Sequence, residues 1–288
     1  MPSQRNIQWF PGHMAKTRRL ITDNLKNVDA VIELLDARIP ISSRNPEIVK
    51  LTASKPRIIL LNKASLADPA MTAKYVAEYT SDNTVCIETD CITGYGLNKI
   101  APAIKKLCQA KLDRYEDKGM SGRMLKAMVL GIPNVGKSSL INKICGNKKA
   151  KVENRPGVTL DKQWVATNIG ILLLDMPGIL WPKFEDPTVG ENLAVTGAIK
   201  DDILDIESIA CTLCSRLREL YPELLCARYK LGDISVADGL SDYELLSLIG
   251  RKRGFLVSGG EIDTERTANM LIDEFRAAKI GRITLDKI

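Results

Sequence analysis

The 288-residue chain carries near its middle the stretch Gly131-Ile132-Pro133-Asn134-Val135-Gly136-Lys137-Ser138, which satisfies the pattern G-x-x-x-x-G-K-[ST]. An apolar run at 127–130 precedes it, and apolar residues at helical spacing follow it. In this strand–loop–helix context, backbone N–H groups and a helix N-terminus surround a polyphosphate. The stretch therefore predicts a nucleoside triphosphate site.

The polar residues of this loop have distinct expected roles. Lys137 is expected to reach the β- and γ-phosphates, and the Ser138 hydroxyl to ligate Mg²⁺. Val135, Gly136 and Ser139 complete the nucleotide-binding residues of the loop. The alternative is a glycine-containing loop with an accidental Lys-Ser pair, and the intact flanking pattern argues against it.

Composition describes an ordinary globular protein, with 45% hydrophobic and 26% charged residues. No apolar run approaches the roughly 18 residues of a membrane span, and no signal peptide is recognisable. We therefore expect a cytoplasmic protein with no membrane partner. The seven cysteines are scattered through apolar segments, which predicts reduced core thiols.

Charge is distributed unevenly along the chain. Residues 1–180 hold 27 Lys and Arg against 16 Asp and Glu, a net charge of +11, whereas residues 181–288 carry −5. A basic first half favours a polyanionic partner larger than a nucleotide, such as RNA. A solvated lysine-rich surface is the alternative.

Apolar runs alternate with helical patterns up to about residue 180, which predicts an α/β fold with a mostly parallel sheet covered on both faces. Strands are expected at 28–35, 57–61, 84–87, 127–130, 162–168 and 170–174, and helices at 14–27, 69–79 and 97–116. Later helical patterns lie at 188–199, 205–219, 241–250 and 264–279. We predict a nucleotide-binding domain at 1–182 and a smaller, mostly helical domain at 183–288.

Two further motifs suit a nucleotide-dependent switch. Asp175 ends an apolar strand and is expected to hold Mg²⁺ through water, while the Gly178 N–H bonds a γ-phosphate oxygen. Thr159 is expected to place its hydroxyl on Mg²⁺ when a γ-phosphate is present.

A third motif, Asn62-Lys63-Ala64-Ser65, follows an apolar strand and resembles the base-recognising Asn-Lys-x-Asp of GTPases. In Ras-like GTPases this motif comes after the phosphate loop, whereas here it comes before. A circular permutation explains the order, because domain termini commonly lie close together at the surface. The switch at Asp175 then leads directly into the helical domain.

Over essentially its full length the chain resembles the circularly permuted ribosome-assembly GTPases of the YlqF/RbgA type. The matching residues are Trp9 to Met14, Asp36 to Pro40, Ser43 to Pro46, Gly131 to Ser138, Arg155 to Thr159, Asp175 to Gly178, Leu180 to Asp186 and Ser258 to Gly260. The resemblance implies a GTPase that acts late in assembly of the bacterial large ribosomal subunit. It also implies docking on rRNA, stimulation by the particle, and a monomer away from the ribosome.

The base pocket departs from the family pattern. Ser65 stands where the motif has an aspartate, and Cys91, next to Asp90, stands where the supporting small-residue motif usually has serine. We expect Asn62, Lys63, Ala64, Ser65, Asp90 and Cys91 to bind a guanine nucleotide weakly. A Ser65→Asp substitution is expected to tighten that binding.

The catalytic group is also unusual. Ile179 occupies the position at which Ras has a glutamine that orients the attacking water. The resemblance points to His13 in that role, with a histidine that only fixes the Pro-Gly turn as the alternative. Asn134 matches a residue that coordinates K⁺ in potassium-activated GTPases, so K⁺ is a second candidate cofactor.

Two other functions remain open from the residues alone. Ile179 is compatible with a nucleotide-sensing RNA-binding scaffold of negligible hydrolysis. Ser65 is compatible with an enzyme of relaxed base specificity that uses ATP or a xanthosine nucleotide. Basic residues at 251–253 and 279–282 are expected to add phosphate contacts to RNA.

Overall fold

The computed structural model describes residues 12–120, 122–146, 164–181 and 184–288. Within these ranges one six-stranded sheet has the order β3-β2-β1-β4-β6-β5. Its strands are β1 (Ala30–Asp36), β2 (Arg57–Asn62), β3 (Thr84–Glu88), β4 (Leu125–Gly131), β5 (Trp164–Ala166) and β6 (Ile171–Asp175). All neighbouring pairs are parallel except β5 with β6, which confirms a mostly parallel sheet.

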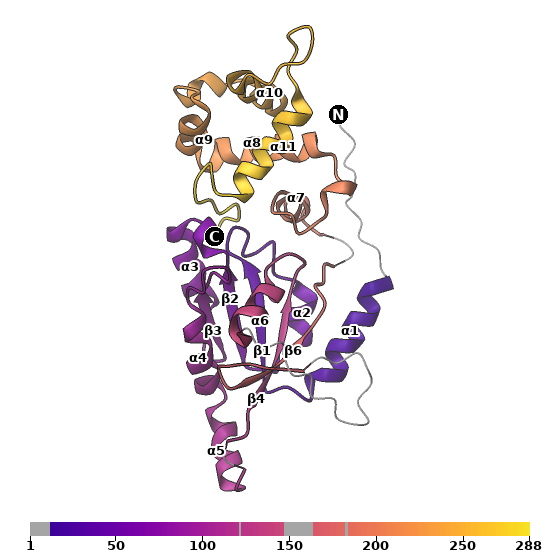
Figure 1. Cartoon of the computed structure of the whole chain (residues 1–288), viewed down its shortest axis with the longest axis vertical. Helices are drawn as coiled ribbons and strands as arrows, with labels where there is room; N and C mark the ends of the chain where they lie inside the picture. Colours follow the sequence, from indigo (N-terminus) through magenta and orange to yellow (C-terminus); the bar gives the residue numbers. More distant parts are fainter. Residues whose placement is uncertain (1–11, 121, 147–163, 182–183) are drawn as a thin grey trace.

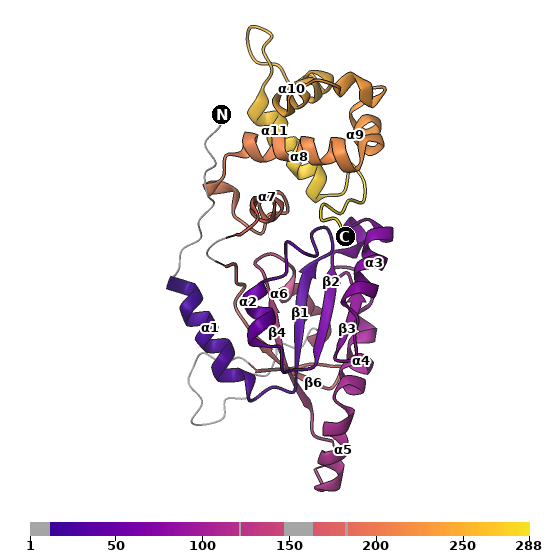
Figure 2. The same ribbon diagram turned by 180° about the vertical axis from the view of Figure 1, so that it is seen from behind.

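Helices cover both faces of the sheet. In Figure 1, α6 lies in front of the strands, and in Figure 2 the view is reversed so that α1 and α2 lie in front. The helices of this part are α1 (Gly12–Leu25), α2 (Pro46–Leu51), α3 (Pro69–Tyr79), α4 (Ile100–Leu107), α5 (Gln109–Asp117) and α6 (Lys137–Cys145). The central strands β1 and β2 are buried along their whole length, because this layering removes both faces from water.

A second group of helices, here called the helical part, lies beyond the carboxyl ends of β1 and β2 (Figure 1). It consists of α7 (Pro187–Val195), α8 (Ile206–Leu220), α9 (Pro222–Tyr229), α10 (Asp242–Arg253) and α11 (Thr264–Arg276). Local signals set its boundaries: Ser241 and Glu244 form a capping box at the start of α10, and Gly254 ends that helix in a left-handed conformation. Buried apolar side chains form one cluster that runs from the sheet into these helices.

The C-terminal tail, residues 279–288, leaves α11 and returns to the sheet, so that the C-terminus lies between the helical part and the end of β2 (Figure 1). The Ile283 N–H donates to the Leu66 carbonyl at 3.1 Å, and the Leu285 N–H donates to the Arg38 carbonyl at 2.8 Å. Arg282 donates to the carbonyls of Ala64 and Ala67 at 2.7 and 2.8 Å. The tail therefore packs on the loops that follow β1 and β2.

Several predicted element boundaries were wrong. Helix α1 begins at Gly12 rather than residue 14, because a helix start, where N–H groups have no intrahelical partner, tolerates glycine. The helix expected at 97–116 is broken at Cys108, which ends α4 and precedes α5. Helices α2 and α9 were not predicted, because six and eight residues are too short to show a clear periodicity.

All seven cysteines are free, and six of them are buried, which confirms that they are core thiols. None of the described helices is long and apolar enough to cross a membrane.

Candidate nucleotide site

The phosphate loop, residues 131–138, connects β4 to α6 as predicted. Gly136 adopts φ 107°, a left-handed conformation that favours glycine. A Cβ atom at this position would also lie only 2.3 Å from the side-chain nitrogen of Asn62. The second glycine of the motif is therefore required both by its backbone conformation and by the approach of the neighbouring loop.

A cavity of about 770 Å³ opens beside the phosphate loop. It is lined by the loop, by the end of β6 and by one side of α1, with lining residues that include Lys16, Leu20, Asn24, Lys137, Ser138, Ser139, Asp175 and Gly178. The structure thus brings together four of the predicted phosphate, Mg²⁺ and switch residues, namely Lys137, Ser138, Asp175 and Gly178. The contribution of α1 was not predicted, because its basic amphipathic pattern does not show which element it faces.

Lys137 is turned back onto its own loop. Its ammonium donates to the carbonyls of Gly131 and Ile132 at 3.1 and 2.8 Å. Burial lowers the pKa of Lys137 to about 8, with Asp175 opposing the shift. Burial also raises the pKa of Asp175, and here Lys137 opposes the shift. A polyphosphate in the cavity would give this partly desolvated ammonium a stronger partner than neutral carbonyls.

Gly178 lies against the phosphate loop. A Cβ atom there would stand 2.8 Å from the Lys137 ammonium and 2.9 Å from Pro133, so a side chain at this position would collide. The next residue, Ile179, donates its N–H to the Gly131 carbonyl at 3.3 Å and is only 8% exposed. Its side chain belongs to the core, which agrees with its inability to orient water.

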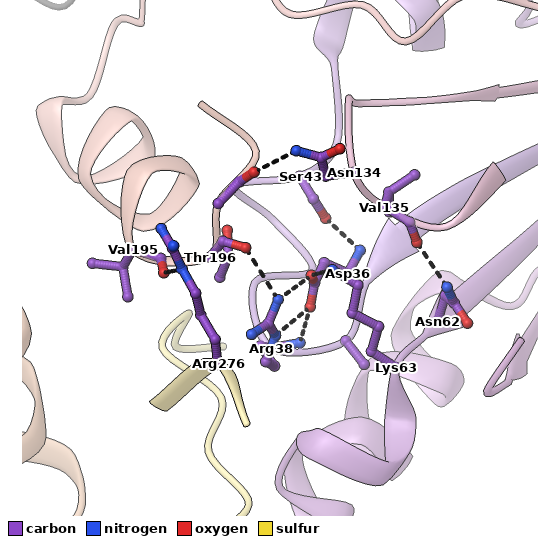
Figure 3. A network of polar contacts seen from close by, with 12 residues as sticks. Asp36, Arg38, Ser43, Asn62, Lys63, Asn134, Val135, Val195, Thr196 and Arg276 are labelled. Carbon is purple, nitrogen blue, oxygen red and sulfur yellow. Dashed lines mark hydrogen bonds and ion pairs between the residues drawn. The ribbon is translucent and has the colours of Figure 1, made fainter. Parts of the chain in front are cut away.

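Asn62, at the carboxyl end of β2, connects three loops by hydrogen bonds. Its side-chain nitrogen donates to the Val135 carbonyl at 2.7 Å (Figure 3). Its side-chain oxygen accepts the Cys91 N–H at 2.9 Å. The base loop, residues 62–68, is thereby fixed to the phosphate loop and to loop 89–96. The Cys91 N–H is thus used within the protein to hold Asn62.

A buried ion-pair cluster lies behind Asn62. Asp36 accepts two hydrogen bonds from the Arg38 guanidinium at 2.9 and 2.7 Å and pairs with Lys63 at 2.9 Å (Figure 3). Burial alone would raise the pKa of Asp36, but Arg38 and Lys63 outweigh it and hold that pKa well below its ordinary value. The cluster fixes Lys63, whose φ of 61° is left-handed, at the start of the base loop. The sequence signal for this cluster was the Asp-x-Arg pattern at residues 36–38, which begins at the last residue of a buried strand.

The loops that we predicted to bind the base contain a carboxylate although position 65 lacks one. The Ser65 hydroxyl donates to Asp90 Oδ2, and Asp90 Oδ1 accepts the N–H groups of Ile92 and Thr93 at 2.9 and 3.0 Å. Burial would raise the pKa of Asp90, but these hydrogen bonds together lower it. Sequence reasoning placed both residues in the pocket and missed their contact.

The other predicted site residues lie as follows. The Ala64 backbone carbonyl accepts from Arg282 of the tail. Asn134 donates to the Gly197 carbonyl at 2.8 Å, and the backbone of His13 lies in the first turn of α1. Thr159 lies outside the described residues.

The phosphate loop lies at the end of a strand in a mostly parallel sheet, and Asn62 connects it by a hydrogen bond to the Asn-Lys loop. This combination defines a P-loop GTPase. A family model described as "50S ribosome-binding GTPase" matches residues 126–213. The ribosome biogenesis GTPase A of Priestia megaterium is 48% identical over 97% of this chain and 96% of its own length. That of Bacillus pumilus is 47% identical over 98% of both chains. The chain belongs to the ribosome biogenesis GTPase A family, and it is a GTPase.

Solved structures agree with this assignment. The GNP-bound structure of YlqF from T. maritima has a TM-score of 0.62 and 26% identity, covering 94% of this chain and 98% of the YlqF chain. The GDP-bound structure of TM YlqF has a TM-score of 0.61 and 25% identity, covering 93% and 99%. The fold class that we expected is therefore confirmed.

Proposed function

We propose that this GTPase assists late assembly of the bacterial large ribosomal subunit and docks on ribosomal RNA in a nucleotide-dependent way. The names of its relatives support the ribosomal partner and a cytoplasmic location. The observation that carries the nucleotide dependence is the hydrogen bond from Asn134, in the phosphate loop, to the Gly197 carbonyl at the end of α7.

The backbone carbonyls at the carboxyl end of α7 accept hydrogen bonds from side chains of several distant segments. Arg38 donates to the Thr196 carbonyl at 3.4 Å, and Arg276 donates to the Val195 carbonyl at 2.9 Å (Figure 3). Donors and cations at this end satisfy carbonyls that have no intrahelical partner and interact favourably with the helix dipole. Since the phosphate loop, the Asp36 cluster and α11 all meet here, a change in the phosphate loop on nucleotide binding would be passed to the helical part.

We assign Mg²⁺ to Ser138, to Thr159 and, through water, to Asp175. Ser138 and Asp175 line the same cavity, and Mg²⁺ commonly uses few protein oxygens together with phosphate oxygens. The ion would neutralise charge on the β- and γ-phosphates.

For K⁺ we propose Asn134. Its amide nitrogen is bonded to the Gly197 carbonyl, so its amide oxygen is the atom that would hold the cation. A cation at this place would offset charge that develops on the phosphates, a role that an arginine finger fills in other GTPases.

We propose His13 as the group that orients or deprotonates the attacking water. The lining residues Lys16, Leu20 and Asn24 follow one another at helical spacing, so one side of α1 borders the cavity. Position 13 lies in the same helix, three residues before Lys16, and positions three apart share a helix face.

For RNA contact we propose the basic first half of the chain together with Arg251 and Lys252, which are exposed at the end of α10. Two other candidates are occupied within the protein. Arg253 pairs with Glu274, and Arg282 bonds the base loop. The proposed organisation is a permuted GTPase domain at 1–182 and an RNA-binding helical domain at 183–288, monomeric away from the ribosome.

The test is co-sedimentation with large-subunit particles in the presence of a GTP analogue or of GDP. We expect tighter association in the triphosphate state, with affinity that falls as salt rises because RNA binding releases counterions. Equal association in both states would overturn the coupling through α7. Turnover measured with and without particles separates an active factor from a scaffold.

A further inference from the structure

We propose that Asp90, through its hydrogen bond with Ser65, is the specificity-determining carboxylate of the base pocket. It would replace the aspartate that is missing from Asn62-Lys63-Ala64-Ser65. The inference rests on the guanine-nucleotide binding of the same site and names the groups that recognise the base.

The two loops that carry this pair are tightly joined. Ser65 follows β2 and Asp90 follows β3, and these neighbouring parallel strands end at the same edge of the sheet. Backbone hydrogen bonds from Thr89 to Leu61 at 2.8 Å and from Ala64 to Thr89 at 3.0 Å fix one loop on the other. The backbone therefore holds the Ser65 and Asp90 positions next to each other.

The hydrogen-bonding pattern of the pair is determined. Asp90 is 5% exposed, and Oδ1 is occupied by the N–H groups of Ile92 and Thr93. These hydrogen bonds and the one from Ser65 compensate the burial of the carboxylate. An ionised carboxylate only accepts, so the Ser65 hydroxyl must donate its single hydrogen to Oδ2.

As a result, exposed Ser65 presents only acceptor lone pairs, with the negative charge of Asp90 directly behind them. Guanine offers two donors at this edge, the ring N–H and the exocyclic amine. Xanthine has a carbonyl where guanine has the amine, and this acceptor would face another acceptor. The pair therefore favours guanine and disfavours xanthine, because two facing acceptors repel each other and form no hydrogen bond.

This arrangement reverses our expectation for position 65. A Ser65→Asp substitution would place a second carboxylate against Asp90, and two adjacent carboxylates cannot both ionise readily. The single substitution should therefore fail to tighten GDP binding. Exchanging the two residues, Ser65→Asp with Asp90→Ser, restores one carboxylate and one hydroxyl.

The decisive variant is Asp90→Asn. The Ile92 and Thr93 N–H groups hold the amide oxygen, so the amide nitrogen must face Ser65 and donate to it. The Ser65 hydroxyl is then free to donate to a ligand. We expect GDP affinity to fall about 10- to 100-fold, the loss of one or two hydrogen bonds, and XDP affinity to rise above wild type.

The experiment measures dissociation constants of GDP, IDP and XDP for the full chain. IDP lacks the amine, so the preference of wild type for GDP over IDP should disappear in Asp90→Asn and return in the exchanged double variant. Glu88→Gln is the control, because this nearby carboxylate bonds only the exposed Tyr95 hydroxyl among the described groups.

Unchanged preferences among the three nucleotides in Asp90→Asn would overturn the role of Asp90. Equal weakening of all three would also overturn it, since that result indicates a structural role only. If wild type binds GDP as the proposed function requires, either result rejects this inference alone, whereas a wild type that binds no GDP rejects the proposed function.

Discussion

The side-chain nitrogen of Asn62 donates to the backbone carbonyl of Val135 at 2.7 Å, across 73 positions of the chain. The same amide accepts the Cys91 N–H through its oxygen, so one buried side chain positions the phosphate loop and two loops of the base pocket together. The phosphate loop is therefore mechanically connected, through Asn62, to the loops that we expect to bind the base.

The substitution Asn62→Asp should break the hydrogen bond that connects these loops. A carboxylate keeps the acceptor for Cys91 but turns its second oxygen toward the Val135 carbonyl, where a donor is needed. We expect the free energy of unfolding to fall by about 1–3 kcal/mol and GDP affinity to fall about tenfold or more. Urea unfolding and GDP titration measure the two effects. The exposed change Asn269→Asp should do neither, and a fully stable Asn62→Asp variant would contradict the assignment.

The pH dependence of nucleotide binding should follow Lys137. The free protein loses the Lys137 proton above a pKa of about 8, whereas the phosphates of a bound nucleotide favour the charged form. Binding must then take up a proton, so GDP affinity should fall as pH rises above about 8, by up to tenfold per pH unit. Calorimetry in buffers of different ionisation enthalpy counts the proton. Lys137→Arg should bind with no such slope, because arginine stays protonated.

The tail should contribute strongly to stability through Asp286. This carboxylate accepts from the Ile41 and Ser42 N–H groups at 2.7 and 2.8 Å and from Asn192 at 2.9 Å. Asp286→Ala leaves these buried donors with fewer partners, so we expect a loss of about 2–4 kcal/mol in urea unfolding. Lys287→Ala removes only an exposed ion pair and should cost less than about 1 kcal/mol. Similar losses for both variants would show that the tail is not held by Asp286.

For catalysis we expect His13→Ala to lower particle-stimulated GTP turnover by roughly 10²-fold while leaving GDP affinity near wild type. Thr22→Ala, an exposed change in the same helix, should leave both quantities unchanged. Normal turnover in His13→Ala would leave the histidine a structural residue of the helix start.

Cation dependence tests Asn134. Replacing K⁺ by Na⁺ should slow hydrolysis in wild type, and the difference should disappear in Asn134→Ala because the amide oxygen is lost. A wild-type rate that is the same in both salts would remove K⁺ from the site.

The features that could be predicted from the sequence are those that depend on short local patterns of residues. The phosphate loop follows a buried strand and opens a helix, and Asp68 with Pro69 caps α3, because each signal lies within a few residues. These patterns were sufficient for the sheet and for the phosphate end of the site.

Contacts between distant segments were not predictable. The sequence indicated Ser65 and Asp90 separately as base-binding residues, but only the alignment of β2 and β3 shows that they contact each other. The tail has no helical or strand periodicity, and its backbone hydrogen bonds to Leu66 and Arg38 leave no mark on residue type. Tertiary placement, rather than local preference, decides both.

The returning tail also affects the order in which contacts form during folding. Arg282 bonds the Ala64 carbonyl across 218 positions, so a ribosome that makes this protein translates the base loop long before its tail partner. Until then the base loop lacks the two hydrogen bonds that Arg282 supplies, and contacts so distant in sequence form late in folding. The predicted base loop therefore gains these contacts only after a segment more than two hundred residues further along has been made and has returned to the sheet.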